Sequence, residues 1–246
     1  MSKTIPEWAA GDGRPPIVAT AAYKGGDGKS TLARELAYLL DSVLIDFDWD
    51  LGGNTRSWGH RHEERVTAPL LDAFERGRTP RPLRGRRKAD LVPSHPDWAN
   101  QQPDRDTGTD ALVKWVTEWK RPGVVDTHPG GCESTYAALN AANVIVVPAV
   151  YAKESLNALE GMCDELTDYP LLIIPYMVQA PPQWARRRLR DITRRYDVPV
   201  GPPVGYESWI PTRTLNMAIS SEPVPMRARQ FVSQMDRVVD AVINYA

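Results

Sequence analysis

The chain has 246 residues, of which 42% are hydrophobic and 25% are charged, with a formal net charge of −1. This composition is typical of a globular protein with a sizeable core, and it excludes disordered and collagen-like chains. Two cysteines are too few for a disulfide framework, and no stretch approaches about 18 consecutive apolar residues, so we expect a cytoplasmic protein without a membrane span.

The first predicted unit alternates strand, loop, helix and strand. After an N-terminal lead over residues 1–15, the apolar run at 17–23 predicts a strand that ends in a glycine-rich loop at 24–31. Leucines at helical spacing predict a helix that begins at Ser30. The apolar run at 43–47 is too short for a helix and predicts the next strand, at whose end two aspartates stand.

The remainder of the chain continues this alternation of short apolar runs with helix-period stretches. Predicted strands cover residues 91–92, 123–126, 144–150 and 171–177, and predicted helices include 153–166 and 226–245. Such alternation specifies an α/β fold, here a single doubly wound, mainly parallel sheet with helices on both faces, in one domain over residues 16–246. Residues 76–88 hold seven basic residues in thirteen positions without apolar periodicity, which predicts a loop or a disordered insertion.

The glycine-rich loop has the parts of a phosphate-binding loop. Such a loop wraps phosphates with successive backbone N–H groups at a helix N-terminus, while a lysine reaches the β- and γ-phosphates and a hydroxyl holds Mg²⁺. The candidate nucleotide-binding residues are Lys24, Gly25, Gly26, Asp27, Gly28, Lys29, Ser30 and Thr31. The strict pattern G-x-x-x-x-G-K-[ST] fails because its first glycine would fall on Tyr23, and the loop reads K-G-G-x-G-K-S instead. A glycine-rich turn that binds nothing is the alternative, which the preceding strand and the following helix disfavour.

This loop resembles the deviant Walker A motif of the ParA/MinD superfamily of P-loop ATPases, and the resemblance extends from about residue 16 to the end of the chain. Residues 46–48 (DFD) resemble the second acidic motif of that family, and residues 124–129 (VVDTHP) resemble its Walker B strand and switch. Trp58 and Arg61, which follow the second motif, are similar to the small plasmid-type ParA partition ATPases. The resemblance implies a P-loop NTPase fold of the deviant Walker A type.

The resemblance also implies that the site binds ATP and Mg²⁺. It places Lys29 on the β- and γ-phosphates, Ser30 on the metal, and Asp126 beside the metal through a water molecule. Asp46 would help to place the metal shell.

The catalytic residues implied by the resemblance are Lys24, Lys29 and Asp48. Lys24 is the signature lysine, which in this superfamily crosses the interface of an ATP-sandwiched homodimer and plays the part that an arginine finger plays elsewhere. Asp48 would orient or activate the attacking water. For an arbitrary aspartate at a strand end, a helix cap or a surface turn is the alternative.

Three positions depart from the family pattern. Asp27 stands where a small or apolar residue is usual, and its charge should weaken nucleotide binding unless a cation offsets it. The run at 49–54 replaces the commoner Pro-Gln-Gly-Asn continuation, and His128 replaces a frequent proline in the switch. By resemblance, the base pocket is expected near the end of the strand at 171–177 and the loop at 210–213.

A cationic helix face is a candidate DNA-binding surface. Over residues 183–196 an apolar stripe at helical spacing predicts a buried face, and four arginines fall on the opposite face. They are Arg186, Arg187, Arg190 and Arg194. Contact with DNA phosphates would be sequence-independent and sensitive to salt, and a solvated polar face is the alternative. Residues 76–88 offer a second basic surface, and the eight tryptophans are interpreted as core and packing residues.

The two cysteines argue against an iron–sulfur cluster. Cys132 follows the switch, where relatives of the nitrogenase iron protein bind a cluster with two cysteines per subunit. Cys163 lies on the apolar stripe of the helix predicted at 153–166, so we interpret it as a small buried hydrophobic residue.

The function implied by the resemblance is that of a DNA partition ATPase. Such a protein dimerises on ATP, binds nonspecific DNA and is released when a ParB-like or other adaptor protein stimulates ATP hydrolysis, which is slow without that partner. We therefore expect a nucleoid-associated protein that does not contact membranes. A ParA-like ATPase that positions a protein cargo would look nearly identical, and the biosynthetic members of the superfamily mostly lack the signature lysine. A MinD-like membrane-associated positioning ATPase needs a strongly basic amphipathic C-terminal helix, whereas residues 226–245 carry three basic residues.

Overall fold

The centre of the protein is a single parallel sheet. The computed structural model describes residues 4–11, 13–50, 53–61 and 68–245. Its sheet has six strands in the order β3-β2-β4-β1-β5-β6. They are β1 Ile17–Thr20, β2 Val43–Asp46, β3 Asp90–Val92, β4 Gly123–Asp126, β5 Val144–Ala149 and β6 Leu171–Pro175. Every neighbouring pair is parallel, which confirms the predicted α/β sheet.

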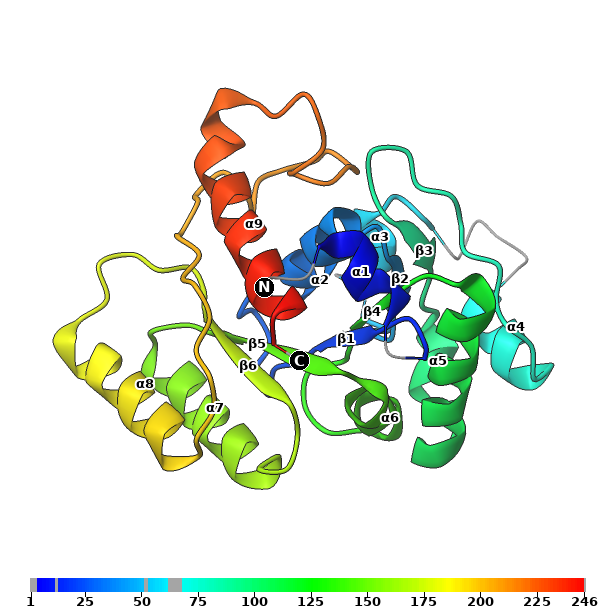
Figure 1. Cartoon of the computed structure of the whole chain (residues 1–246), viewed down its shortest axis with the longest axis horizontal. Helices are drawn as coiled ribbons and strands as arrows, with labels where there is room; N and C mark the ends of the chain where they lie inside the picture. The colour runs from blue at the N-terminus through cyan, green and yellow to red at the C-terminus, as the bar shows by residue number, and fades with distance from the viewer. Residues whose placement is uncertain (1–3, 12, 51–52, 62–67, 246) are drawn as a thin grey trace.

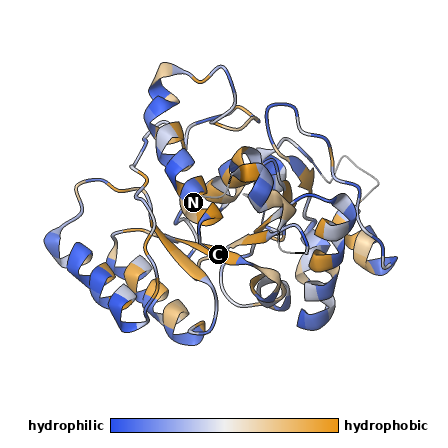
Figure 2. Ribbon diagram, in the orientation of Figure 1, coloured by the Kyte–Doolittle hydropathy of each residue, from blue (hydrophilic) through white to orange (hydrophobic). Residues whose placement is uncertain are grey.

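Helices cover both faces of this sheet (Figure 1). They are α1 Ile5–Ala10, α2 Lys29–Leu39, α3 Asn54–Ser57, α4 Pro69–Glu75, α5 Arg105–Trp119, α6 Glu133–Ala141, α7 Lys153–Glu165, α8 Gln183–Arg195 and α9 Arg229–Ile243. One buried apolar cluster packs α4 to α8 against one face, and a second packs α1, α2 and α9 against the other. Figure 2 shows the apolar strands lying between helices whose outer surfaces are largely polar. Strands buried on both faces need continuous apolar runs, which is the pattern of this sequence.

The helix of the phosphate loop begins one residue earlier than predicted, at Lys29 instead of Ser30. Gly28 precedes it with a φ of 88°, in the left-handed region, and its carbonyl accepts the Leu32 N–H at 3.1 Å. A Cβ atom at Gly28 would lie 2.1 Å from the Tyr176 ring. Glycine is therefore required here for its backbone conformation and for the close approach of β6.

Two segments contain structure that the sequence pattern does not specify. The N-terminal lead contains α1, which begins at a capping box and buries Trp8 in the cluster of α2 and α9. The basic segment 76–88 is a structured loop, because Leu83 and Leu91 exchange backbone hydrogen bonds of 2.7 and 2.9 Å. Of the two alternatives for this segment, the disordered insertion is wrong.

The predicted C-terminal helix at 226–245 consists of a 3₁₀ turn at Met226–Ala228 followed by α9. Its apolar stripe lies in the core, where none of its members is more than 1% exposed. These residues are Phe231, Met235, Val238 and Val242. Within the part of the chain that the structure describes, no helix is long and apolar enough to cross a bilayer.

The register of the sheet brings polar strand ends together. Thr20 of β1 and Asp46 of β2 both pair with Asp126 of β4, so these three residues lie in one row at the carboxyl edge. Ligands of open α/β sheets bind at this edge.

Candidate nucleotide-binding site

A cleft of about 610 Å³ opens at the carboxyl edge of the sheet. Its walls are the phosphate loop, the start of α2, the segment after β2 and the loop at 205–216. Seven members of the predicted nucleotide-binding set line it: Lys24, Gly25, Gly26, Gly28, Lys29, Ser30 and Thr31. The size of the cleft, together with Lys24, Lys29 and Arg34 in its lining, suits a small anionic ligand.

Asp27 is the member of the predicted set that does not line the cleft. Its Oδ1 accepts a hydrogen bond of 2.8 Å from Ser155 Oγ on α7, and the residue is 8% exposed. Burial raises the pKa of the Asp27 carboxyl group, while Ser155 and the charge of Lys24 act in the opposite direction. The carboxylate thus faces α7, which lessens the repulsion of phosphates that the sequence predicts.

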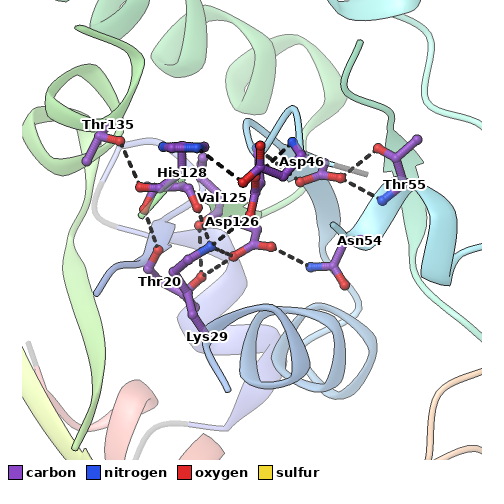
Figure 3. Close-up of polar contacts among 12 residues, drawn as sticks. Thr20, Lys29, Asp46, Asn54, Thr55, Val125, Asp126, His128 and Thr135 are labelled. Carbon is purple, nitrogen blue, oxygen red and sulfur yellow. Dashed lines mark hydrogen bonds and ion pairs between the residues drawn. The ribbon is translucent and has the colours of Figure 1, made fainter. Parts of the chain in front are cut away.

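Lys29 lies between the carboxylates of Asp126 and Asp48, and Figure 3 shows its contact with Asp126. Its Nζ donates to Asp126 Oδ1 at 2.7 Å and to the Thr127 carbonyl, and it lies 3.8 Å from Asp48 Oδ2. None of the three charged side chains is more than 10% exposed. A buried charge is tolerated only when it is paired, so the lysine and the two aspartates depend on one another.

Asp126 receives hydrogen bonds from three different segments. Its Oδ1 accepts from Lys29 and from the Thr20 hydroxyl at 3.2 Å, and its Oδ2 accepts from Asn54 Nδ2 at 2.9 Å (Figure 3). Asn54 has no role predicted from the sequence. Its Oδ1 is buried and has no hydrogen-bond partner among the described residues. Asn54 Oδ1 is thus a buried acceptor beside the Asp126 carboxylate, and it is suited to accept a hydrogen bond from a water molecule bound to a magnesium ion.

Asp46 is held by protein groups at the end of β2. Its Oδ2 accepts both the backbone N–H and the hydroxyl of Thr55 at 2.6 Å, and its Oδ1 accepts the Asp48 N–H at 3.2 Å. Burial and the nearby charge of Asp126 raise the pKa of Asp46 to about 8. These contacts anchor α3 to the end of β2. Asp46 therefore has a structural role in addition to the metal-binding role that the resemblance implies.

Asp48 lines the cleft and is held less tightly than Asp46. Its Oδ1 accepts the Asp50 N–H at 3.1 Å, and its Oδ2 is the atom that faces Lys29. Burial raises the pKa of the Asp48 carboxyl group, and the charge of Lys29 opposes that rise. A carboxylate whose basicity is raised by burial is suited to orient a water molecule or to accept its proton.

Two of the departures from the family pattern lie against each other. The rings of Trp49 and His128 are stacked, with centroids 3.8 Å apart and planes 3° apart. His128 Nε2 also lies 3.5 Å from Asp50 Oδ2. The ligand atoms of Asp48, Asp50 and His128 lie within 4.8 Å of one another, a spacing that could hold a metal ion.

The resemblance predicts the base pocket near the end of β6 and the loop at 210–213, and the cleft reaches both segments. Tyr176 and Met177 at the end of β6 and residues 205–216 line it. Arg34 of α2 also lines the cleft, and its Nε is buried without a hydrogen bond among the described residues. Arg34 is not among the predicted site residues, although its spacing of four residues from Ser30 places both on one helix face.

The four arginines of α8 are all exposed, while Ala185, Leu189 and Ile192 are buried in the core. Arg188 and Arg195 of the same helix form ion pairs with Glu160 of α7. Trp184, which the sequence places among the core residues, is instead 52% exposed on this helix. The predicted amphipathic helix is confirmed, and its role as a DNA-binding surface stays a prediction.

Comparison with known proteins identifies the fold. No protein-family model matches the chain, and no curated protein matches it. Among solved structures, a McdA variant from Cyanothece in complex with ATP is 18% identical with a TM-score of 0.72, over 91% of this chain and 96% of that one. A putative plasmid partition protein from Borrelia burgdorferi B31 bound to AMPPNP is 16% identical with a TM-score of 0.72, over 95% and 100% of the two chains. MinD from Aquifex aeolicus is 16% identical with a TM-score of 0.68, over 91% and 96%. The chain therefore has the fold of the ParA/MinD ATPases, as its motifs predict.

Proposed function

We propose that the protein is a Mg²⁺-dependent ATPase that hydrolyses ATP to ADP and phosphate. The observation that carries the proposal is the arrangement of Lys29, Asp126 and Asp48 at the start of α2, beside a cleft lined by the phosphate loop. Similar solved structures support it, because one is described as a complex with ATP and another as bound to AMPPNP. A cobyrinic acid a,c-diamide synthase from Mycobacterium smegmatis, 20% identical, is described with bound ADP and magnesium.

Each of these residues has a separate role in the proposed hydrolysis of ATP. Lys29 would exchange its carboxylate partners for phosphate oxygens of ATP. The Ser30 hydroxyl and the Asp126 carboxylate would hold Mg²⁺, and the buried Asn54 Oδ1 would accept a hydrogen bond from water bound to that ion. When bound, Mg²⁺ would supply positive charge to offset the negative charge of the transferred phosphoryl group. Asp48 orients the attacking water, and its raised pKa makes it a stronger base than a free carboxylate.

Lys24 extends the site to a second copy of the chain. It lines the cleft and is half-buried. In the arrangement that the motif implies, two protomers enclose two ATP molecules and the Lys24 of each one contacts the nucleotide of the other. The charge supplied across the interface then couples hydrolysis to dimerisation.

The experiment for this site measures ATP-dependent dimerisation by light scattering together with phosphate release. Lys29→Ala should abolish nucleotide binding, whereas Asp48→Ala should bind ATP and persist as a dimer, since the first variant lacks the phosphate cation and the second only the water-orienting group. Lys24→Ala mixed with Lys29→Ala reports whether the signature lysine acts in trans. Equal loss of ATP affinity in Lys29→Ala and Asp48→Ala contradicts the assigned roles.

For the biological role we propose DNA partition, with an adaptor protein that stimulates hydrolysis. Among the similar structures, two are described as plasmid partition proteins from Borrelia burgdorferi. The burial of the α9 apolar stripe favours DNA over a membrane surface, because a docked helix offers lipid no apolar face. A McdA-like or MinD-like positioning role is the second candidate, since structures of both are similar to the chain.

The DNA surface can be tested by its salt dependence. With ATP and Mg²⁺, the protein should bind duplexes of unrelated sequence about equally. Joint replacement of three exposed α8 arginines by alanine should flatten the slope of affinity against salt by up to about three units, at roughly one per phosphate contact. The three are Arg186, Arg187 and Arg190. A triple variant in the basic loop (Arg78, Arg81 and Arg84) is the matched control that separates the two basic surfaces. Sedimentation with anionic vesicles but not with DNA would favour the MinD-like alternative.

A further inference from the structure

We propose that His128 is a positioning residue for hydrolysis, which holds the segment of Asp48 in place through its ring stack with Trp49. The inference rests on the proposed ATPase function and deepens it. It assigns a task to two residue types that replace the commoner ones of ParA/MinD ATPases at these positions.

The first observation is that one side chain makes two contacts with the two residues that follow Asp48. The His128 ring lies parallel to the Trp49 ring, with 3.8 Å between centroids and 3° between planes. The same imidazole places Nε2 3.5 Å from Asp50 Oδ2. Trp49 is half-buried against the core, whereas the Asp50 side chain is 66% exposed, so the ring stack is the better protected contact.

The second observation is that His128 is attached to the rigid part of the fold. Its carbonyl accepts the Thr135 hydroxyl of α6 at 3.3 Å (Figure 3). The preceding residue, Thr127, donates its hydroxyl to the Thr20 carbonyl at 3.0 Å. His128 is therefore held at the ends of β1 and β4. Through the ring stack it restrains Trp49, and with it the backbone next to Asp48.

The third observation connects this segment to the proposed catalytic carboxylate. The Asp50 N–H donates to Asp48 Oδ1 at 3.1 Å, while Asp48 Oδ2 faces Lys29 at 3.8 Å. If Trp49 and Asp50 shift, Oδ1 loses its donor and the carboxylate is free to rotate about its ion pair. The loss would affect the orientation of the water and leave the phosphate loop unchanged, so the chemical step should suffer and nucleotide affinity should not.

The experiment compares His128→Ala with His128→Phe in the full chain. A phenyl ring can stack on Trp49 but cannot pair with Asp50, so it separates the two contacts. We expect His128→Ala to lower kcat about two- to tenfold, the range that corresponds to the loss of an aromatic pair, and His128→Phe to recover most of it. The dissociation constant for AMPPNP should stay within about twofold of wild type in both variants. Trp119→Phe is the control, since this tryptophan of α5 donates its indole N–H to the Pro80 carbonyl and does not line the cleft.

Tryptophan fluorescence gives a readout that does not depend on turnover. Removal of the imidazole exposes the Trp49 ring, so His128→Ala should shift its emission to longer wavelength, and a phenyl ring should reverse the shift. Trp49→Leu removes the other ring of the stack and should lower kcat as His128→Ala does. Either variant can therefore test the positioning role if the other one does not fold.

Three results would overturn the inference. They are a wild-type kcat in His128→Ala, an equal loss in His128→Ala and His128→Phe, and a loss of AMPPNP affinity with an unchanged kcat. A wild-type protein that binds no AMPPNP and hydrolyses no ATP refutes the proposed ATPase function itself. Wild-type hydrolysis with an unaffected His128→Ala variant refutes only the positioning role.

Discussion

Replacement of Lys29 by methionine tests the charge balance of the site without any ligand. The substitution keeps an unbranched side chain that is one atom shorter, and it removes a charge that lies 2.7 Å from Asp126 and 3.8 Å from Asp48. Removing one member of a buried ion pair leaves the other charge uncompensated and costs about 3–5 kcal/mol. At about 2–4 °C per kcal/mol for a chain of this size, the melting temperature of Lys29→Met should fall by about 6–20 °C.

The stability deficit of Lys29→Met should depend on pH. Burial and Asp126 raise the pKa of Asp46 to about 8. A carboxyl group with a raised folded-state pKa contributes stability at low pH that is lost as the pH rises through that value. Without the charge of Lys29, ionisation of the neighbouring carboxyl groups becomes less favourable in the folded protein, so the stability deficit should be larger near pH 9 than near pH 6.

Thermal denaturation followed by circular dichroism measures the fall in melting temperature and its dependence on pH. A double variant tests the contribution of the Lys29–Asp126 ion pair. Asp126→Asn in the Lys29→Met background removes the charge that the first substitution leaves unpaired, so it should recover part of the lost stability. A Lys29→Met variant that melts within about 2 °C of wild type near pH 9 would show that Lys29 does not balance the buried carboxylates, because a fall of at least about 6 °C is expected. A double variant no more stable than the single one would show the same.

Three further predictions concern residues outside this pair. Burial raises the pKa of the Cys163 thiol to about 11, so in the native protein a thiol reagent near pH 8 should label the half-exposed Cys132 and reach Cys163 only after denaturation, as mass spectrometry of the labelled peptides would show. Glu35 is fully buried and accepts three hydrogen bonds from Ile219 and Ser220, so Glu35→Ala should lower the free energy of unfolding in urea by about 2–4 kcal/mol, and an unchanged value would contradict this. Burial raises the pKa of the Asp27 carboxyl group, so Asp27→Asn should melt higher than wild type at neutral pH, with a gain that disappears as the pH falls and wild-type Asp27 becomes protonated.

The sequence by itself determines the fold class and the place of the phosphate loop. Strand runs such as 43–47, the helix spacing after Ser30 and the glycines before it are local features, because each depends on side chains within a few residues along the chain. A parallel α/β sheet brings the carboxyl ends of its strands to one edge, so the sequence also predicts that the aspartates after β2 and at the end of β4 share a site.

The local sequence pattern does not determine the contacts of a residue that could either face solvent or pack against a distant part of the chain. The sequence shows that Asp27 is an extra charge in the phosphate loop, but only packing against α7 decides that it faces Ser155, 128 residues away. Segment 76–88 has no apolar periodicity, and its order comes from pairing with β3. Trp184 resembles a core residue by type alone, but it lies beside Arg187 and Asp191 on α8, outside the buried stripe of that helix, and is exposed to solvent.

The tertiary structure alone decided how the charges of the site are balanced. Lys29 and Asp126 are 97 residues apart and Asn54 and Asp126 are 72 apart, and each of these contacts exists because the parallel register sets β2, β4 and the start of α2 side by side. The stack of Trp49 on His128 likewise joins two segments that the sequence presents as unrelated departures from one pattern. Side-chain direction at a strand end depends on the backbone that follows it and on its neighbours across the sheet, which no period in the sequence encodes.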